Sequence, residues 1–420
     1  MMMVILPIVC ALALMGAPLF IVMSAFSILA FMSSDISLSA ISIEMYRLSS
    51  APTILTIPLF TLAGHMMAKS KSPERILNFA QSLIGHLPGG VPIMALMVCA
   101  FFTAFTGASG VTIIALGGLL YPILKKSGGS DAFSLGLVTT SGSLGLLFPP
   151  SLPIILYGLV SRVDIDHLFL GGILPGMLIV FLLSLYSIKE TRVSFTQREK
   201  FSWVSLKKNT LKASGELFIP IFVLSGLYSG TITITEAAAF TALYVFILEV
   251  FIHKEIKLKT DLPAILIESA TLVASILLIL CSALAVTNYL VDDEVPQKLL
   301  TWMKTFIDSP ISFLLFLNVL LLIVGSIMDI FSAIIIIVPL IIPMSAEFGI
   351  HPVHLAMIFL TNLEIGYLTP PVGINLFIAS NQFKRPIMQV YSSTMPFLLV
   401  LFVALMIVTY VPFLSTAFLP

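Results

Sequence analysis

The sequence has few charged residues, since Asp, Glu, Lys and Arg together make up 10% of its 420 residues. Soluble globular proteins carry about 25% charged residues, so this shortage excludes a large water-soluble domain. The 21 basic and 21 acidic residues balance, and a chain without net positive charge is not expected to bind nucleic acid. Hydrophobic residues account for 58% of the chain, which predicts an all-α membrane protein with many spans.

Cysteine and nucleotide-binding motifs are also scarce. Cys10, Cys99 and Cys281 lie far apart in apolar stretches, so we expect small core residues rather than a disulfide or a metal site. The sequence has no G-x-x-x-x-G-K-[ST] phosphate loop, which argues against transport driven by ATP. The first apolar run has no basic region before it, so we expect a span rather than a removed signal peptide.

Apolar runs long enough to enter or cross a membrane follow one another along the chain. They cover 3–31, 52–68, 91–124, 132–160, 167–188, 215–230, 232–252, 262–290, 311–344, 353–381 and 391–418. The positive-inside rule places the basic loops 189–213 and 253–261 in the cytoplasm and the acidic stretch 292–294 outside. The segment between the two basic loops must therefore cross the membrane twice.

Two of these runs are too long for a single crossing. Run 91–124 has basic residues on both flanks, and both flanks of run 311–344 are expected to lie outside. A re-entrant hairpin that enters and leaves on one side satisfies both patterns. Small and polar residues at 106–110 and 325–329 predict the two turns. A single kinked, steeply tilted helix is the alternative for each run.

Each half of the chain also has a Pro-Pro pair in the middle of an apolar segment. Pro149-Pro150 and Pro370-Pro371 lie 221 residues apart (370 minus 149). Two adjacent prolines remove two backbone donors and clash with the preceding turn, so a continuous helix cannot pass through them. Within a membrane such breaks survive where the freed backbone groups face protein, water or an ion. Paired breaks in corresponding halves indicate a transporter with a binding site near the bilayer midplane.

The order of span, span, hairpin, broken span and span occurs in both halves with opposite orientation. We therefore predict two inverted repeats, an arrangement typical of secondary transporters. The first repeat covers 1–213, with hairpin 91–124, broken helix 132–160 and the cytoplasmic basic loop 189–213. A linking span at 214–230 precedes the second repeat, which covers 231–420 with hairpin 311–344 and broken helix 353–381.

Amphipathic segments at 73–87 and 296–307 precede the two hairpins. We expect interfacial helices that link each hairpin to the rest of the protein, so that one block could move as a unit. A simple connector on the membrane surface is the alternative.

Hairpin turns and broken helices expose helix ends inside the membrane, where free carbonyls favour cations and free N–H groups favour anions. The predicted cation ligands are Gly107, Ser109, Gly145 and Phe148 in the first half, and Gly325, Asp329, Gly366 and Thr369 in the second. Carbonyls with a hydroxyl and a carboxylate form a hard oxygen set that suits Na⁺. No chain of intramembrane Asp, Glu and His suggests a proton relay, so Na⁺ is preferred to H⁺ and no other cofactor is expected.

Several polar residues beside the breaks are candidates for a binding role. The predicted substrate ligands are Ser109, Ser151, Asn362 and Asn375. The structural alternatives are a serine bonded to its own helix and an asparagine that satisfies unwound backbone. Asp329 is a functional candidate because an unpaired charge at a re-entrant turn is costly, and its alternative is a helix cap. Glu364 is a further candidate, which the break could open to water.

Five stretches spread over nearly the whole chain carry a family resemblance. They are Ile57-Pro-Leu-Phe-Thr-Leu-Ala-Gly64, Gly142-Ser-Leu-Gly-Leu-Leu-Phe-Pro-Pro-Ser151, Thr235-Glu-Ala-Ala238, Gly325-Ser-Ile-Met-Asp329 and Ile365-Gly-Tyr-Leu-Thr-Pro-Pro-Val-Gly-Ile-Asn375. In this order they resemble the large membrane subunit of TRAP transporters, the tripartite ATP-independent periplasmic family.

The resemblance implies an elevator-type Na⁺ symporter for organic-acid anions, such as a C4-dicarboxylate or sialic acid, in a bacterial inner membrane. It implies two partners, a small four-helix membrane subunit and a periplasmic substrate-binding protein. The family's Na⁺ sites carry over to Ser109, Gly145, Phe148, Pro149, Asp329, Gly366 and Thr369. The chain departs from many members after the first turn, where it reads Gly110-Val-Thr-Ile-Ile instead of including an Asp.

Three other functions are compatible with parts of the sequence. Residues 107–110 match the short G-x-S-x pattern of intramembrane serine proteases, but no later span is expected to bury a histidine base, so no enzyme is predicted. A channel needs a continuous pore, whereas two sealed hairpins from opposite sides suit alternating access. A stand-alone Na⁺/dicarboxylate or arsenite-type carrier has a similar architecture and differs in needing no binding protein.

Overall fold

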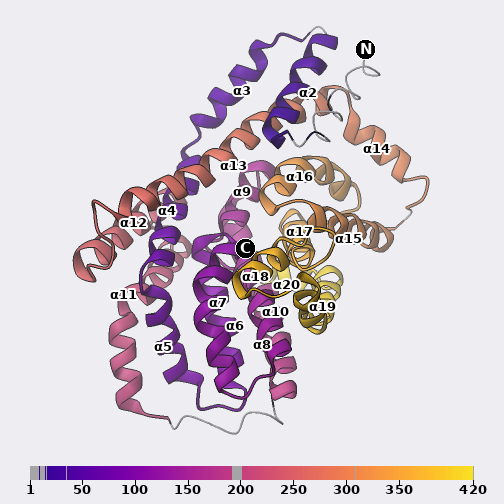
Figure 1. The fold of residues 1–420 in the computed structure, drawn as a ribbon. Helices are drawn as coiled ribbons and strands as arrows, with labels where there is room; N and C mark the ends of the chain where they lie inside the picture. Colours follow the sequence, from indigo (N-terminus) through magenta and orange to yellow (C-terminus); the bar gives the residue numbers. More distant parts are fainter. Residues whose placement is uncertain are drawn as a thin grey trace.

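The computed structural model describes residues 9, 15, 17–34, 36–191, 201–307 and 309–419. Within these ranges the chain forms helices and no strand (Figure 1). The helices of the first half are α2 Leu19–Ser33, α3 Ser39–Ser49, η1 Pro52–Leu55, α4 Thr56–Lys69, α5 Ser72–Ile84, α6 Gly90–Thr106, α7 Ser109–Lys126, α8 Asp131–Ser141, η2 Leu144–Leu147, α9 Leu152–Ser161 and α10 Ile165–Thr191. Those of the second half are α11 Trp203–Tyr228, α12 Ile234–Ile247, the π-helical turn η3 Leu248–Ile252, α13 Asp261–Asp292, α14 Val295–Met303, α15 Pro310–Ile327, α16 Ile330–Glu347, α17 Pro352–Gly366, α18 Ile374–Phe383, α19 Ile387–Tyr410 and α20 Phe413–Thr416.

Seven of the described helices are long and apolar enough to cross a membrane, or up to nine spans if each bent helix pair counts as one. The predicted all-α, multi-pass membrane fold is therefore confirmed. Most of the run 3–18 lies outside the described residues, as does the stretch 192–200 of the predicted basic loop.

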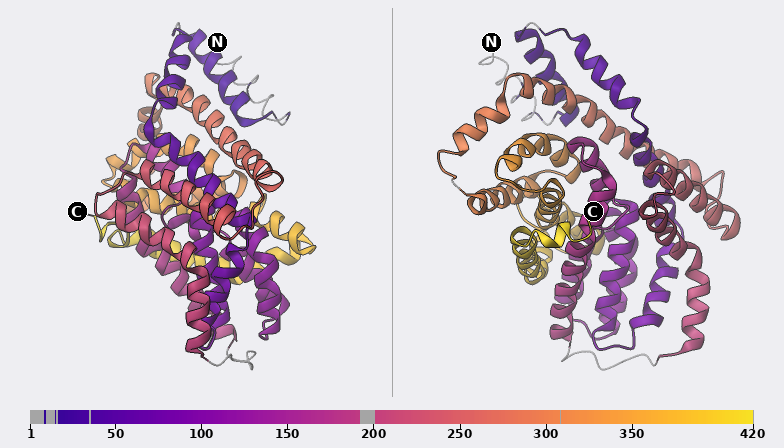
Figure 2. Two further views of the ribbon diagram at one scale, coloured as in Figure 1. Left: turned by 90° about the vertical axis from the view of Figure 1, so that its left-hand side faces the viewer. Right: turned by 180° about the vertical axis from the view of Figure 1, so that it is seen from behind.

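The long helix α13 organises one side of the molecule. It crosses the fold diagonally and packs against α2, α3 and α4, and also against α14 and α16 (Figures 1 and 2). On the other side α6, α7, α8 and α10 run alongside one another, and α5 lies beside α11.

Corresponding elements of the two halves recur at a nearly constant spacing. α7 and α16 both have 18 residues, and they begin and end 221 residues apart (330 minus 109, 347 minus 126). The chain turns at 107–108 between α6 and α7, and at 328–329 between α15 and α16. α7 packs against α18, and α16 packs against α9. The second helix of each pair therefore contacts the broken segment of the other half.

Two sequence-based boundaries differ from the structure. The predicted loop 189–213 is helical at both ends, because α10 continues to Thr191 and α11 begins at Trp203. The Ser202 side chain accepts a hydrogen bond from the Ser205 N–H and caps α11 despite its basic first turns. Helix α3 lies outside the apolar runs because it mixes polar and apolar residues.

Arg75 joins α5 to α11 and to the end of α12. Its guanidinium donates to Glu216, to Glu249 Oε1 at 2.8 Å and to Glu255 Oε1 at 2.6 Å, with 11% of the Arg75 side chain exposed. Burial favours the neutral form of Glu255, but hydrogen bonds from the Lys71 backbone and from Arg75 outweigh it and hold the pKa of Glu255 below its ordinary value. The arginine therefore fixes α5 against two other helices.

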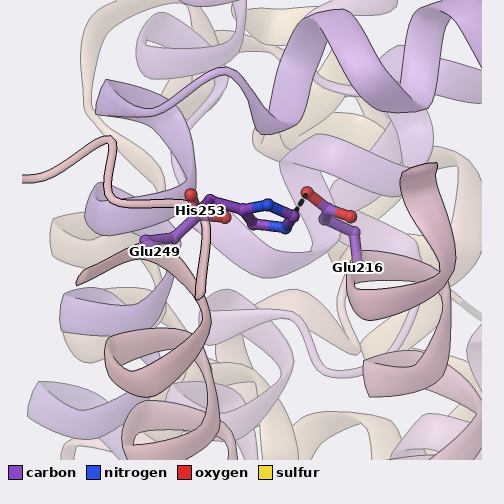
Figure 3. Close-up of side chains that lie close together, drawn as sticks. All are labelled: Glu216, Glu249 and His253. Carbon is purple, nitrogen blue, oxygen red and sulfur yellow. Dashed lines mark ion pairs between the residues drawn. The ribbon is translucent and has the colours of Figure 1, made fainter. Parts of the chain in front are cut away.

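Glu216, Glu249 and His253 form part of the same cluster (Figure 3). One possible ligand atom of each lies within 4.8 Å of the others, which is close enough to hold a metal ion. His253 Nε2 lies 4.0 Å from Glu216 Oε1. Since the Arg75 guanidinium already bonds both carboxylates, the chain itself supplies a cation at this position.

We expect Arg75→Met to lower the melting temperature of the purified protein. The change leaves buried carboxylates without their cation, and breaking a buried pair costs about 3–5 kcal/mol. Lys69→Met is the matched control, because the Lys69–Glu268 pair is 53% and 48% exposed and such pairs contribute about 0–1 kcal/mol. Thermal unfolding followed by size-exclusion chromatography measures both variants. Equal melting temperatures would contradict a stabilising role for the network.

Candidate functional site

The two Pro-Pro breaks are built on the same tight turn. In the first, the Phe148 N–H donates to the Gly145 carbonyl at 3.1 Å, and in the second the Thr369 N–H donates to the Gly366 carbonyl at 3.0 Å. These donors and acceptors are again 221 residues apart (369 minus 148, 366 minus 145). The Pro-Pro peptide bond that follows each turn is cis. The predicted broken helices are thus interrupted at the expected residues by the same local structure.

In the first half, the hairpin turn packs closely against the break. Gly107 has φ +64, and a Cβ there would lie 2.5 Å from the Leu152 side chain. A Cβ on Gly145 would lie 2.2 Å from the Ala100 carbonyl oxygen of α6. These contacts need glycine, because any larger residue would separate the hairpin from the broken helix.

The second half shows the same close approach. A Cβ on Gly366 would lie 2.4 Å from the carbonyl carbon of Gly325. The Ser326 carbonyl accepts from the Val372 N–H at 3.0 Å. The Tyr367 hydroxyl accepts from the N–H of the first residue of α16 at 2.7 Å. Backbone groups that the break leaves free thus find partners in the hairpin turn.

Ser109 and Asn375 bring the two halves together. The Ser109 hydroxyl donates to Asn375 Oδ1 at 2.7 Å, and both residues are buried. The Asn375 Nδ2 group has no hydrogen-bond partner among the described residues, and neither has the buried Ser151 hydroxyl. Ser109 is the first residue of α7 and Asn375 is the second residue of α18, so two helix N-termini converge here.

The other predicted ligands have partners outside the Ser109–Asn375 contact. Asn362 Nδ2 donates to Asn318 Oδ1 of α15 at 2.7 Å and to the Ile358 carbonyl at 2.8 Å. Its buried Oδ1 has no hydrogen-bond partner among the described residues. The Asp329 carboxylate accepts from the Ser332 N–H at 3.0 Å, which is the helix cap anticipated as its alternative. Thr369 Oγ1 donates to the Ile365 carbonyl near the end of α17 at 2.9 Å.

Two expectations about buried ionisable residues are wrong. Glu364 is fully buried, so the break does not open it to water in this conformation. His354 is also buried, in the first turn of α17, although no buried histidine is expected in a later span. The His354 ring contacts the Ser415 hydroxyl and the Thr409 carbonyl rather than a serine nucleophile, so the geometry gives no support to a protease.

Sequence reasoning misses the contributions of Ser326 and Tyr367. The Ser326 carbonyl and the Tyr367 hydroxyl each accept a hydrogen bond that joins the hairpin turn to the break. The bond to Tyr367 connects residues that are 37 positions apart in the sequence. No local pattern encodes this pairing. A tyrosine three residues before a Pro-Pro break is the one available signal, since a buried hydroxyl must find a partner.

Comparisons with known proteins agree with this architecture. The family model described as the tripartite ATP-independent periplasmic transporter, DctM component, matches residues 4–414. The C4-dicarboxylate TRAP transporter large permease protein of Pseudomonas aeruginosa is 34% identical over 91% of this chain and 89% of its own length. The sialic acid TRAP transporter large permease protein of Vibrio cholerae is 33% identical over 86% of this chain and 84% of its own.

A solved transporter structure shares the fold. The YdaH transporter of Alcanivorax borkumensis has a TM-score of 0.60 over 85% of this chain and 86% of its own. Its sequence identity is 13%, so this likeness concerns the fold alone. These sequence relatives are transporter permeases and not enzymes.

We expect Gly366→Ala to lower the melting temperature of the purified protein. The added methyl would overlap the backbone at Gly325, and overpacking of this kind costs about 1–3 kcal/mol. Gly118→Ala in α7 is the matched control, because its Cβ would meet no atom nearer than 3.8 Å. Comparable melting temperatures for the two variants would show that the hairpin and the break are not in backbone contact.

Proposed function

The chain belongs to the DctM component family of tripartite ATP-independent periplasmic transporters, and on that premise we propose that it imports an organic-acid anion together with Na⁺. The anion is a C4-dicarboxylate, sialic acid or a similar carboxylate. A periplasmic binding protein delivers it, and a small four-helix subunit completes the complex in the bacterial inner membrane. The absence of a phosphate loop in the sequence is consistent with an ion gradient as the energy source.

The observation that supports this function best is the contact between Ser109 and Asn375. The Ser109 hydroxyl donates to Asn375 Oδ1, so the donor that this pair leaves free for a carboxylate oxygen is the Asn375 Nδ2 group. The two helix N-termini that begin near these residues add positive partial charge. An anion could therefore bind here without any arginine or lysine, with Ser151 as a further hydroxyl from the first break.

We place the coupling cations beside this anion site. The first site uses Gly107, Ser109, Gly145, Phe148 and Pro149, and the second uses Gly325, Asp329, Gly366 and Thr369. Helix C-termini end at both hairpin turns and carry negative partial charge, which favours a cation. The recurring turn at both breaks supports two sites of similar geometry, and Asp329 supplies the single carboxylate.

The contacts between halves suggest how transport proceeds. α7 packs on α18 and α16 packs on α9, so the hairpins and broken helices form one block. We infer that this block belongs to two inverted repeats and moves as an elevator against α11, α12 and α13. Helix α5, which leads into the first hairpin, is bonded to α11 through Arg75. This bond would keep α5 attached to α11, α12 and α13 while the block moves.

Dependence on a binding protein distinguishes this proposal from a stand-alone carrier. Proteoliposomes that contain the chain and its small subunit should take up labelled succinate or sialic acid after the cognate binding protein is added, and not before. The control is the same binding protein with liposomes that lack the permease. Saturable uptake without any binding protein would favour the stand-alone Na⁺/dicarboxylate or arsenite-type carrier.

Na⁺ titration in the same proteoliposomes tests the cation sites. Asp329→Asn retains an acceptor for the α16 cap but removes the charge, and Ser109→Ala removes a hydroxyl. We expect each to raise the Na⁺ concentration for half-maximal uptake about tenfold, which corresponds to 1.4 kcal/mol. Ser345→Ala is the control, since within the described ranges that buried hydroxyl bonds the Ile342 carbonyl of its own helix and no other group. If both test variants gave the same Na⁺ titration as the wild type, the assignment of Asp329 and Ser109 as Na⁺ ligands would be wrong.

A further inference from the structure

A cavity of about 680 Å³ lies beside the long helix α13. Helices α3 and α13 form one part of its wall, and the end of α9 together with α16 forms the other. Small-molecule sites usually have volumes of about 300–1,000 Å³, so the cavity is large enough for an organic anion. Neither Ser109 nor Asn375 lines it, so it is separate from the contact between those residues.

The lining residues place this cavity at the external side of the molecule. Asp292 is one of them, and it begins the acidic stretch 292–294 that the positive-inside rule places outside. In the transport scheme proposed above, α13 belongs to the stationary part, whereas α9 and α16 belong to the moving block. A ligand in the cavity would therefore touch both parts.

The charges on the cavity wall favour an anion. Within the described ranges the charged lining residues are Arg47 of α3, Arg162 directly after α9, and Asp292 at the end of α13. All three are exposed. A cleft with a surplus of one charge concentrates ions of the opposite sign, and here two cations face one acid. Thr287 and Asn288 of the same wall add a hydroxyl and an amide that can donate hydrogen bonds.

Arg162 occupies a backbone position that glycine usually fills. Its φ is +58, in the left-handed region, where glycine is the common residue at the end of a helix. The second broken helix ends in the same way, because Lys384 follows α18 with φ +51. Both helices have 10 residues, and the two basic residues are 222 positions apart (384 minus 162). In inverted repeats this pair lies at opposite membrane surfaces. The structural alternative is a cation that only complements the helix dipole.

We propose that Arg47 and Arg162 form an external site that binds a carboxylate group of the transported anion before it reaches Ser109 and Asn375. The identity of this anion rests on the proposed function. Ion pairs between exposed groups are weak because water screens them, so the site attracts the anion without retaining it. That weakness is required, because the contact between Ser109 and Asn375 has no cationic side chain with which to draw away a tightly held anion.

Charge-selective labelling of the full-length protein tests the site without transport. Thr287→Cys places a thiol on the cavity wall in a chain whose three native cysteines are replaced by alanine, and Asn288→Cys is a second reporter. The two reagents are a sulfonate and a trimethylammonium methanethiosulfonate, used at low ionic strength. Arg162→Gln should lower the ratio of the anionic to the cationic reaction rate about fivefold, because one nearby positive charge is lost.

Two control variants accompany this measurement. Arg162→Lys keeps the charge and should keep the ratio of the two rates. Lys298→Gln removes a cation that is paired with Asp293 at 3.1 Å and does not line the cavity, so it should also leave the ratio unchanged. A ratio that Arg162→Gln does not alter would overturn the site and leave Arg162 as a helix end alone.

Succinate and sialic acid are the ligand probes in the same experiment. At least one should slow labelling of Thr287→Cys by both reagents, with or without Na⁺, and should lose this effect in Arg162→Gln. Protection by neither anion overturns the proposal. A lipid phosphate has related chemistry, so nanodiscs with and without phosphatidylglycerol are compared. Protection by that lipid and by neither anion would assign the arginines to a lipid headgroup instead.

Uptake shows whether the site lies on the transport path. In the proteoliposome assay, Arg162→Gln should slow uptake several-fold at low concentrations of loaded binding protein. It should leave the Na⁺ concentration for half-maximal uptake unchanged, because Arg162 belongs to neither proposed cation site. Unchanged uptake in a variant with an altered labelling ratio would overturn the entry role. Labelling uses neither uptake nor a binding protein, so its result stands apart from failure of the proposed function.

Discussion

Backbone groups that cannot reach water must find partners within the protein, and this requirement determines the structure around the two Pro-Pro breaks. At each break a tight turn supplies a hydrogen-bond donor to one carbonyl, that of Gly145 in the first and that of Gly366 in the second. The second break also draws on the Ser326 carbonyl and supplies the Tyr367 hydroxyl to the start of α16. Such bonds require backbone to approach backbone, so the hairpin turn and the break have to meet where glycines leave room.

That close approach has an electrostatic consequence. The N-termini of α7 and α18 and the C-termini of α6 and α15 are gathered into one region, so partial charges of both signs lie near one another. A site for an anion next to sites for cations then needs few ionised side chains. This agrees with a chain that is only 10% charged and that has Asp329 as the single acid at the hairpin turns. In the function proposed above, the backbone rather than a set of arginines would provide the recognition.

Local chemistry explains which features the sequence could predict. The Pro-Pro pairs forbid a continuous helix, and the small residues at 106–110 and 325–329 mark turns, so both breaks and both turns lie where expected. Contacts between residues far apart in the sequence produce no local sequence pattern of this kind. The three carboxylates that surround Arg75 come from positions 141 to 180 residues later, and the partner of Asn362 lies in another helix. The Ser109–Asn375 bond joins residues 266 positions apart. The sequence identified both as candidate ligands from their chemistry but did not predict that they contact each other.

Buried acids occur here in two electrostatic settings, which differ in whether a cationic side chain bonds the carboxylate. Glu216 and Glu249 both accept hydrogen bonds from the Arg75 guanidinium, which offsets part of their negative charge and holds α5 in place. Glu364 has no hydrogen-bond partner within the described residues, so an ionised carboxylate there would be uncompensated. The two settings therefore differ in what the acid contributes to the fold, since the first joins helices and the second does not.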